Sequence, residues 1–300
     1  SSAASDVYKR QPQRSHMLSY RHAFHAGNHA DVLKHAVQAL IIESLKKKEK
    51  PFIVLDTHAG GGLYDLRGDW SQKKAEYADG IKRLWDERAQ WSAMAPYLGV
   101  IEEMNSDGQL HYYPGSPELS RRLIRDQDKL ALMELHNNEV EDLRANMGYD
   151  PRVAVHHRDG FEGLVALLPP TPRRGLVLID PPYELKEDYF AVVDTLKKAQ
   201  KRWATGIYAL WYPILGQEAD KSRDMLKAIK RENFGNVLVA ELEVAGQTAD
   251  WGMNGSGMLI VSPPWMLDEQ IEAFLKPLCA RLAQGAGAQY RVEWLNKAEA

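Results

Sequence analysis

Cysteine is nearly absent from this 300-residue sequence, in which Cys279 is the only one. A single cysteine cannot form a disulfide within the chain, which excludes a disulfide-stabilised secreted domain and favours a reducing compartment. Apolar runs of about 20 residues, the length that a membrane-spanning helix requires, are also absent. We therefore expect a cytoplasmic protein with no membrane partner.

Net charge is also low, at a formal −3. This value argues against a protein that coats nucleic acid without specificity, although it leaves room for a local basic surface. Residues 1–16 are polar and lack the apolar core of a signal peptide, so we treat them as a leader outside the fold. The remaining residues are numerous enough to bury the core of one large domain.

Short apolar segments alternate with amphipathic segments along the chain. A helix is predicted over residues 28–48, with Asn28 as its N-cap. The segments with strand character are residues 52–56, 129–134, 152–157, 175–180 and 206–212. Apolar strands separated by helices indicate a parallel sheet that is covered on both faces. Two more strands, 236–244 and 257–265, lie too close for a crossover helix and predict an antiparallel hairpin at one edge of this α/β, Rossmann-like fold.

The distance between the first two strands is unusually long. In dinucleotide-binding folds an acidic residue follows the first glycine loop by about 20 residues. Here the loop ends near Gly62, and the next acidic residue at a strand end is Glu134. Residues 74–105 are rich in helix-forming residues. We therefore predict a main domain of residues 17–63 and 111–300, with an inserted helical subdomain of residues 64–110.

A glycine-rich loop follows the first strand in the stretch L-D-T-H-A-G-G-G. Gly60, Gly61 and Gly62 permit a tight turn and let backbone N–H groups approach a ligand. The spacing departs from G-x-G-x-x-G, which makes a nicotinamide cofactor less favoured. It fits better the looser acid-x-G-x-G-x-G loop of S-adenosylmethionine enzymes, with His58 in place of the first glycine. An ordinary glycine-containing turn is the alternative.

Acidic residues follow the next two strands. Glu134 is suited to accept hydrogen bonds from ribose hydroxyls, and Asp159, followed by Gly160, from an adenine amine. The alternative is that each acid caps the helix that follows it. Ser116, before Pro117, is typical of a helix N-cap, and a helix N-terminus also suits the carboxylate of a cofactor.

The histidine-rich stretch of residues 20–35 raises the question of a metal. His25 and His29 are spaced four apart, but we find no Cys or acid that completes a ligand set, and H-E-x-x-H is absent, so we predict no metal. The polar residues of this stretch, Arg21 and Lys34 among them, are expected to contact a cofactor carboxylate or RNA phosphates. The lysines at 46–50 and the cations at 197–202 are expected to be solvated helix surface.

The stretch Asp180-Pro181-Pro182-Tyr183 follows the fourth strand and lies at the ligand-binding edge of the sheet. Pro182 restricts Pro181 to extended geometry, which directs the Pro181 carbonyl outward. Asp180 and that carbonyl are two fixed acceptors for an amine with two protons, and Tyr183 offers a flat surface on which a base stacks. A simple turn after a strand is the alternative.

This arrangement suits methylation of an adenine N6 amine. The amine is a poor nucleophile because its lone pair is delocalised into the ring, and two acceptors on its hydrogens favour a lone pair directed at a methyl donor. The sulfonium of S-adenosylmethionine supplies the electrophile without a metal. The base has to leave its stack to reach such a pocket.

The D-P-P-Y stretch resembles the [DNS]-P-P-[YFW] motif of N6-adenine methyltransferases. Together with five other stretches it resembles the bacterial 23S rRNA (adenine-N6)-methyltransferase family over residues 17–296. The five are MLSYRHAFHAGNHADVLKH, LDTHAGGG, YYPGSP, ATGIYALWYP and SGMLIVSPPW. The resemblance implies a class I, S-adenosylmethionine-dependent enzyme that acts as a monomer on a hairpin of large-subunit RNA.

The resemblance also implies residue roles. Asp180, with Pro181, is the implied catalytic acceptor and Tyr183 stacks on the target base. Tyr20, Arg21 and His22 are implied to meet the RNA. The implied cofactor-binding residues are His35, His58, Gly60, Ser116, Glu134, Asp159, Gly160 and Asp180. Gly61 departs from the family pattern, where an alanine often stands.

Two alternatives remain open at this stage. D-P-P-Y is shared with DNA adenine-N6 methyltransferases and does not distinguish the sugar, although the sequence has no recognisable module for reading duplex DNA, which favours structured RNA. The second alternative is a non-catalytic RNA-binding assembly factor on the same scaffold. A dehydrogenase is a more distant third.

Overall fold

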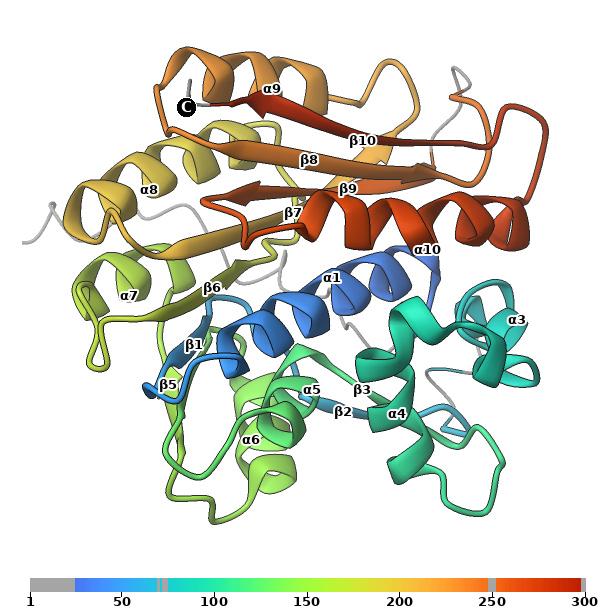
Figure 1. Cartoon of the computed structure of the whole chain (residues 1–300), viewed down its shortest axis with the longest axis horizontal. Helices are drawn as coiled ribbons and strands as arrows, with labels where there is room; N and C mark the ends of the chain where they lie inside the picture. The colour runs from blue at the N-terminus through green and yellow to red at the C-terminus, as the bar shows by residue number, and fades with distance from the viewer. Residues whose placement is uncertain (1–24, 69–70, 72–74, 248–251, 298–300) are drawn as a thin grey trace, which may run out of the picture.

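The structure is a computed structural model that describes residues 25–68, 71, 75–247 and 252–297. Residues 1–16, taken above as a leader, and the predicted RNA-contacting residues Tyr20, Arg21 and His22 lie outside these ranges. The described residues form one large sheet between two layers of helices (Figure 1).

The sheet has eight strands in the order β10-β8-β9-β7-β6-β1-β4-β5. The strands are β1 (Ile53–Asp56), β4 (Lys129–Glu134), β5 (Val153–His157), β6 (Gly175–Ile179), β7 (Ile207–Leu215), β8 (Val237–Glu243), β9 (Met253–Val261) and β10 (Gln289–Asn296). β1, β4, β5, β6 and β7 run parallel, as the apolar strand segments predict. β8 and β9 form the predicted antiparallel hairpin, and β9 also pairs antiparallel with β7.

β10 was missed by the sequence analysis. It pairs antiparallel with β8 and forms the outer edge of the sheet, so the predicted hairpin is not itself the edge. Most β10 residues are only partly buried, and polar residues such as Gln289, Arg291 and Glu293 interrupt its apolar ones. A strand of this kind lacks the continuous apolar run by which buried strands are found.

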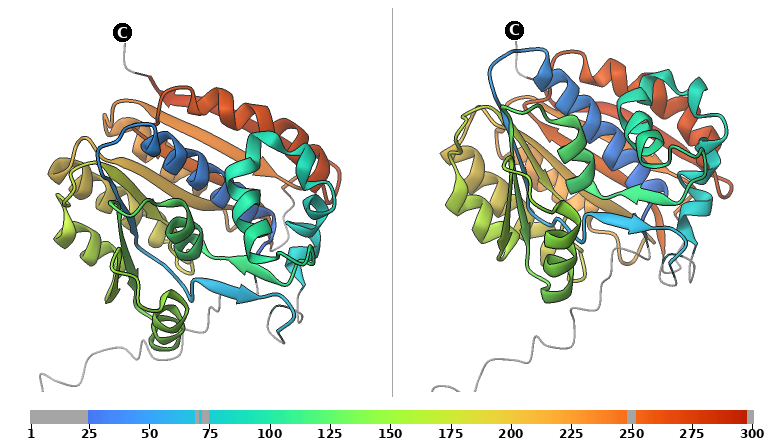
Figure 2. Two further views of the ribbon diagram at one scale, coloured as in Figure 1. Left: turned by 60° about the horizontal axis from the view of Figure 1, so that its bottom comes forward. Right: turned by 90° about the horizontal axis from the view of Figure 1, so that it is seen from below.

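Helices cover both faces of the sheet, three of them prominent on each (Figures 1 and 2). On one face lie α1 (His29–Lys46), α5 (Ser116–Leu123) and α10 (Leu267–Leu282), and on the other lie α7 (Gly160–Leu167), α8 (Asp188–Arg202) and α9 (Ser222–Arg231). α6 (Asn137–Met147) packs beside β4 and β5. The predicted first helix is confirmed, and the Asn28 side chain caps it by accepting from the backbone N–H groups of Ala30 and Asp31, both at 3.0 Å.

Residues 63–114 form a compact segment beside α1 and α10. β2 (Leu63–Asp65) pairs antiparallel with β3 (Tyr112–Pro114), and between them lie several short helices, α3 (Lys82–Trp85) and α4 (Ala95–Met104) among them. The short 3-10 helices of this segment are Glu76–Asp79, Arg88–Gln90 and Ser92–Met94. Ile81, Leu84 and Trp85 are buried in the same hydrophobic core as α1 and the sheet. The division of the chain into a main domain and an inserted subdomain stays a prediction.

The strand order places a crevice between β1 and β6. From β1 the chain moves outward through β4 to β5, and then returns to β6 on the other side of β1. Open α/β sheets bind ligands at the carboxyl ends of the strands where the order reverses in this way. β1 ends at Asp56 and Asp180 directly follows β6, so the topology brings the two carboxylates to this crevice.

Candidate active site

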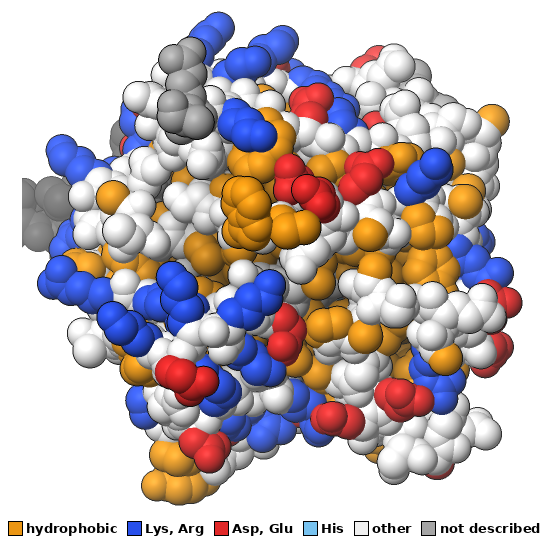
Figure 3. All heavy atoms as spheres, viewed as in Figure 1, with side chains coloured by type: hydrophobic (Ala, Val, Ile, Leu, Met, Phe, Trp, Pro, Cys, Tyr) orange, Lys and Arg blue, Asp and Glu red, His pale blue; other side chains and the backbone are white. Residues whose placement is uncertain are grey.

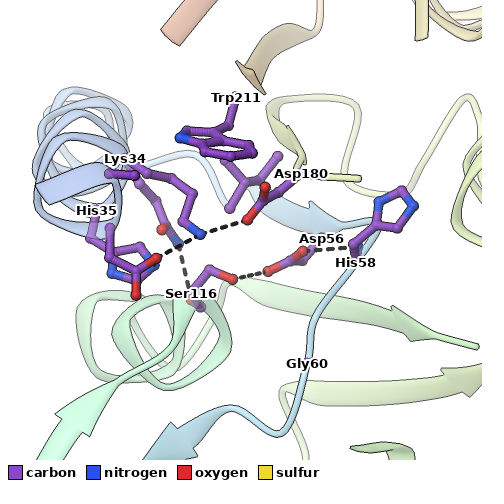
Figure 4. A network of polar contacts seen from close by, with 12 residues as sticks. Lys34, His35, Asp56, His58, Gly60, Ser116, Asp180 and Trp211 are labelled. Carbon is purple, nitrogen blue, oxygen red and sulfur yellow. Dashed lines mark hydrogen bonds and ion pairs between the residues drawn. The ribbon is translucent and has the colours of Figure 1, made fainter. Parts of the chain in front are cut away.

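Asp180 lies at the tip of β6 and faces α1 (Figure 4). Its Oδ2 atom accepts a hydrogen bond from the Lys34 ammonium at an N–O distance of 2.5 Å. The Asp180 side chain is 12% exposed, whereas that of Lys34 is 4% exposed. The carboxylate is therefore held from the interior side while part of it stays open to a ligand.

Lys34 joins two carboxylates that are far apart in the sequence. Its ammonium also lies 2.9 Å from the Asp31 carboxylate on the same helix and 5.9 Å from the centre of the Trp211 ring. Burial alone would lower the pKa of Lys34, but Asp180 and Asp31 together raise it above its ordinary value. The sequence analysis expected Lys34 to contact a cofactor carboxylate or an RNA phosphate. In the structure its partners are instead two carboxylates of its own chain, because one turn of α1 separates it from Asp31 and the helix faces β6.

Tyr183 is held in an unusual backbone conformation. Its φ is +49°, in the left-handed region, and its side chain is only 7% exposed. The hydroxyl donates to the backbone carbonyl of Trp211 at 2.8 Å, and the ring packs against Tyr189 with 4.6 Å between centroids. Strained residues of this kind persist where the surroundings fix them, and they cluster at functional sites. The predicted stacking of Tyr183 on a base stays a prediction.

Pro181 connects Asp180 to Tyr183 and is buried. Among the described residues, no N–H or side-chain donor bonds to its carbonyl oxygen. This oxygen therefore remains an acceptor without an intrachain donor in the described part of the chain, directly beside the Asp180 carboxylate.

Asp56, at the end of β1, is hydrogen-bonded to Ser116. The Ser116 hydroxyl donates to Asp56 Oδ2 at 2.6 Å, and both side chains are buried. Burial raises the pKa of Asp56 to about 6, against the lowering effect of the Ser116 hydrogen bond. The expectation that Ser116 caps α5 was wrong, because Gly115 is the N-cap residue and the Ser116 hydroxyl is used by Asp56 instead.

A hydrogen bond connects the glycine loop to the end of β4. The backbone N–H of Gly60, whose φ is +61°, donates to Glu134 Oε2 at 2.8 Å. The other carboxylate oxygen of Glu134 accepts from the backbone N–H of His136 at 2.7 Å. Each carboxylate oxygen keeps a further lone pair, so these bonds leave Glu134 able to accept from a ribose hydroxyl.

Asp159 caps α7. Its Oδ1 accepts from the backbone N–H of Glu162 at 2.9 Å, so the capping alternative holds for this residue. At Gly160 a Cβ atom would lie 2.0 Å from the backbone oxygen of Thr57, and this close approach alone requires glycine there. Neither observation tests a contact with a cofactor, which remains a prediction for both residues.

The two histidines predicted to contact the cofactor have different surroundings. His35 is fully buried, and its Nδ1 lies 2.8 Å from the Tyr113 hydroxyl. His58 is partly exposed in the glycine loop, with its ring edge-on to Phe161 at 5.1 Å. Burial lowers the pKa of His58 although Asp180, Glu134 and Asp159 act to raise it, so the imidazole is neutral at pH 7.

The site therefore has several carboxylates at the carboxyl end of the parallel strands. Three of the carboxylates that influence the pKa of His58, those of Asp180, Glu134 and Asp159, are ones that the sequence analysis singled out. Among the residues that the structure describes, no group of three or more His, Cys, Asp or Glu side chains is arranged to hold a metal ion. No helix in the described ranges has the length and apolar character of a membrane span.

Comparison with known proteins identifies the family. A sequence model of the family described as ribosomal RNA large subunit methyltransferase D, RlmJ, matches residues 49–296. The chain belongs to this family. It is 47% identical over 279 residues to the ribosomal RNA large subunit methyltransferase J of Escherichia coli strain K12, covering 93% of this chain and 99% of that protein. The Haemophilus influenzae protein of the same name is 45% identical over 281 residues, with the same coverage of both chains.

A solved structure is also similar over most of the chain. The crystal structure of a Legionella pneumophila protein superposes with a TM-score of 0.83 at 34% identity, covering 90% of this chain and 98% of that one. The resemblance stated from the motifs is thus confirmed at the level of the family, and so are the Rossmann-like methyltransferase fold and the class of enzyme. The protein is a methyltransferase that acts on large-subunit ribosomal RNA.

Membership of a methyltransferase family makes S-adenosylmethionine the methyl donor, and the residues present fit it. The cofactor carries a cationic sulfonium, which the carboxylates of this site would stabilise. Its ribose and adenine would offer hydroxyl and amine donors to the acidic residues at the ends of β4 and β5.

Three residues of this site were not among those predicted for it. Lys34 was expected to bind an external anion, Trp211 was not singled out, and Asp56 was noted only as the last residue of a strand. Asp31 and Lys34 stand three residues apart on an apolar helix, and this spacing is a sequence signal of a buried ion pair. The partner on β6 is 146 residues away and could not be inferred from spacing.

Proposed function

We propose that this protein transfers a methyl group from S-adenosylmethionine to the N6 amine of a specific adenine in 23S rRNA. The observation that carries the proposal is the Asp180 carboxylate, partly exposed at the tip of β6 and fixed from behind by Lys34. That the substrate is ribosomal RNA and the reaction a methyl transfer follows from family membership. The atom that is methylated is inferred from this carboxylate and its neighbours.

The proposed reaction uses two acceptors on one amine. Asp180 and the Pro181 carbonyl each accept a hydrogen bond from the N6 amine. These two bonds favour a tetrahedral nitrogen, whose lone pair is no longer delocalised into the ring and can point at the methyl donor. Lys34 donates to Asp180 Oδ2, and the remaining lone pairs of the carboxylate stay available to accept from the amine. The Tyr183 ring, fixed by its bond to the Trp211 carbonyl, lies beside these acceptors as a wall for the base.

When bound, the cofactor would supply the methyl group from its sulfonium: the S–C bond breaks as the N6–C bond forms, the neutral thioether leaves, and one N6 proton is released to solvent. The residues proposed to hold it are His35, His58, Gly60, Ser116, Glu134, Asp159, Gly160 and Asp180. Ser116 and Asp56 bond to each other, and Glu134 bonds to the glycine loop, so several of these groups are already positioned before a ligand arrives. Prepositioned groups lose little freedom on binding.

The RNA side of the proposal rests on the family resemblance. Tyr20, Arg21 and His22 are proposed to contact the substrate RNA, a hairpin in free or early-precursor 23S rRNA, and the protein is proposed to act as a monomer in the cytoplasm. The target base has to leave its stack, because N6 of a paired adenine is not accessible to a carboxylate at a strand tip.

A methylation assay tests this function. The purified protein is incubated with labelled S-adenosylmethionine and either deproteinised 23S rRNA or duplex DNA, and nucleosides are analysed by mass spectrometry. We expect N6-methyladenosine from the rRNA alone. Methylation of the DNA alone would favour a DNA adenine methyltransferase, and methylation of another base or atom would refute the proposal.

The Asp180→Ala variant tests the proposed residue. We expect single-turnover methylation to fall by roughly two to three orders of magnitude, as when one preorganised polar group is removed from a transition state. Cofactor affinity, measured by calorimetry, is expected to change little. An unchanged rate would remove Asp180 from the mechanism, and absence of cofactor binding by the unsubstituted protein would favour a non-catalytic assembly factor.

A further inference from the structure

The edge of the sheet opposite the active site has a distinct composition. The parallel strands β1, β4, β5, β6 and β7 begin there, and the helices α1, α5, α6, α8 and α9 end there. β9 runs in the opposite direction, and its last residue, Val261, pairs with Tyr208 at the start of β7. The segment that follows β9 therefore lies at the same edge, which we call the amino edge.

Exposed cations gather along the amino edge. In Figure 3, many Lys and Arg side chains lie at the left and lower left of the molecule, with some Asp and Glu side chains among them. The exposed or half-buried cations of this edge that have no acidic partner among the described residues are Lys47, Lys48, Lys50, Lys129, Arg173, Arg174, Lys201, Arg202, Lys230 and Arg231. The exposed or half-buried acids at these strand starts and helix ends include Glu49, Asp126, Asp150 and Glu232, of which Asp150 pairs with Arg152 and Glu232 with Lys197. Asp268 and Glu269 follow Trp265 at the start of α10.

Arg174 shows how closely these cations are placed. It lies at the start of β6 and donates to the backbone carbonyls of Lys50 and Leu45. Arg174 and Arg125 both lie against the Phe52 ring, at 5.9 and 5.4 Å from its centre. Burial, and after it the charge of Arg125, lowers the pKa of Arg174, while the Asp128 carboxylate acts to raise it.

Two aromatic side chains are exposed at the same edge. Tyr149, between α6 and β5, is 98% exposed, and Trp265, after β9, is 86% exposed. Trp265 is presented by a segment in which Ser262 and Met266 both have a positive φ, +55° and +61°. A single exposed aromatic side chain is ordinary on a protein surface, so these two rings carry weight only together with the cations between them.

Helix dipoles explain part of the pattern. The carboxyl end of a helix is negative and favours lysine and arginine, so some of the cations stabilise α1, α8 and α9. Helix dipoles do not explain the exposed aromatic rings. They also do not explain Lys129, Arg173 and Arg174, which lie at the starts of strands. Six neighbouring strands, from β9 to β5, separate the two aromatic residues, and at about 4.8 Å per strand gap the amino edge spans about 24 Å between them.

We propose that the amino edge is a second RNA-binding surface, on which phosphates contact the unpaired cations and unstacked bases stack on Trp265 and Tyr149. A basic track with interspersed aromatic rings is the arrangement that binds nucleic acid strands with little sequence preference. The inference rests on the proposed RNA substrate and extends it: a part of the RNA remote from the target adenine contacts the far edge of the sheet, so that the RNA is held at two edges.

Binding assays with matched variants test the inference. The probe is deproteinised 23S rRNA, and its affinity is measured by filter binding over a series of KCl concentrations. One variant carries Lys47→Gln, Lys48→Gln and Lys50→Gln, and another carries Trp265→Ala. A control carries Lys82→Gln and Lys276→Gln, two exposed lysines on α3 and α10 away from the amino edge.

Each phosphate contact contributes about 0.7 to 0.9 to the slope of log affinity against log salt. We expect the amino-edge lysine variant to lose about 2 to 3 from this slope and the control to keep it. Trp265→Ala is expected to weaken binding roughly 10-fold or more at every salt concentration. Both variants should raise the KM for RNA and leave kcat at saturating RNA unchanged, because neither touches the active site.

Equal affinities and equal salt slopes in the amino-edge variants and the control would overturn the inference. The failure of the proposed function looks different. If the unsubstituted protein bound the rRNA but methylated no adenine, the proposed function would be refuted. The salt slopes of the variants would still test whether the amino edge binds RNA. The Asp180→Ala variant separates the two, since it is expected to bind RNA with the full slope and to methylate poorly.

Discussion

Asp56 is expected to make folding less favourable as the pH rises. The carboxyl group is buried, and burial raises its pKa in the folded state to about 6, above its ordinary value of 3.8. An acid with a raised pKa holds its proton more tightly in the folded state, so its contribution to the free energy of unfolding falls as the pH rises from about 4 to above 6. Two pKa units at 1.36 kcal/mol each correspond to about 3 kcal/mol at pH 7.

The Asp56→Asn variant isolates this effect, because an amide has the same shape and does not ionise in this range. We expect the variant to be no more stable than the unsubstituted protein near pH 4, and more stable by up to about 3 kcal/mol at pH 7. The other ionisable groups are the same in the two proteins, so the difference between their free energies of unfolding removes those contributions to a first approximation.

Urea denaturation followed by circular dichroism, at intervals between pH 4 and pH 8, measures this difference. Ser116→Ala is the matched control: it removes the hydrogen bond that lowers the pKa of Asp56, so the pH window should extend upward. A difference between Asp56→Asn and the unsubstituted protein that does not vary with pH would refute the reasoning. The stabilised variant is also expected to methylate more slowly, since strained groups are often retained for function.

Three further predictions concern neighbouring contacts. Lys34→Met leaves the Asp31 and Asp180 carboxylates without their shared ammonium, and we expect the free energy of unfolding in urea to fall by about 3–5 kcal/mol; an unchanged value would mean that the ion pair is not formed in solution. Asp159→Ala removes the cap of α7 and should cost about 1 kcal/mol in the same assay, while a parallel loss of cofactor affinity in calorimetry would show that this carboxylate also binds. Tyr183→Phe keeps the ring and loses the bond to the Trp211 carbonyl, so stability should fall by about 1 kcal/mol with methylation largely retained; abolished methylation would give the hydroxyl a direct part in the reaction.

Much of the fold could be predicted because buried parallel strands have a clear sequence signature. The apolar runs that end at Asp56, Glu134 and Ile179 are strands in the structure, and the carboxylates beyond them meet at one edge. β10 has no such signature, since its polar residues are tolerated at an exposed edge. Edge strands are defined by what they pair with, and pairing depends on the rest of the fold.

The candidate site was predictable in part for a similar reason. Positions at strand ends could be assigned, but the partners of each side chain depend on packing. Ser116 carries the sequence signature of a helix cap and yet donates to Asp56, and Lys34 meets Asp180 across the crevice. Ser262-Pro263-Pro264-Trp265 fits the same pattern as Asp180-Pro181-Pro182-Tyr183, and only the direction of β9 puts it at the opposite edge.

The continuity of the hydrophobic core has a consequence for engineering the chain. Tyr97 and Ile81, from the segment between β2 and β3, are buried together with residues of α1 in one cluster. Excising residues 64–110 would uncover apolar surface on the helix that carries Lys34, and His35 would lose its neighbour Tyr97. A shortened chain or a chimera that exchanges this segment between relatives would therefore have to exchange the matching face of α1 as well.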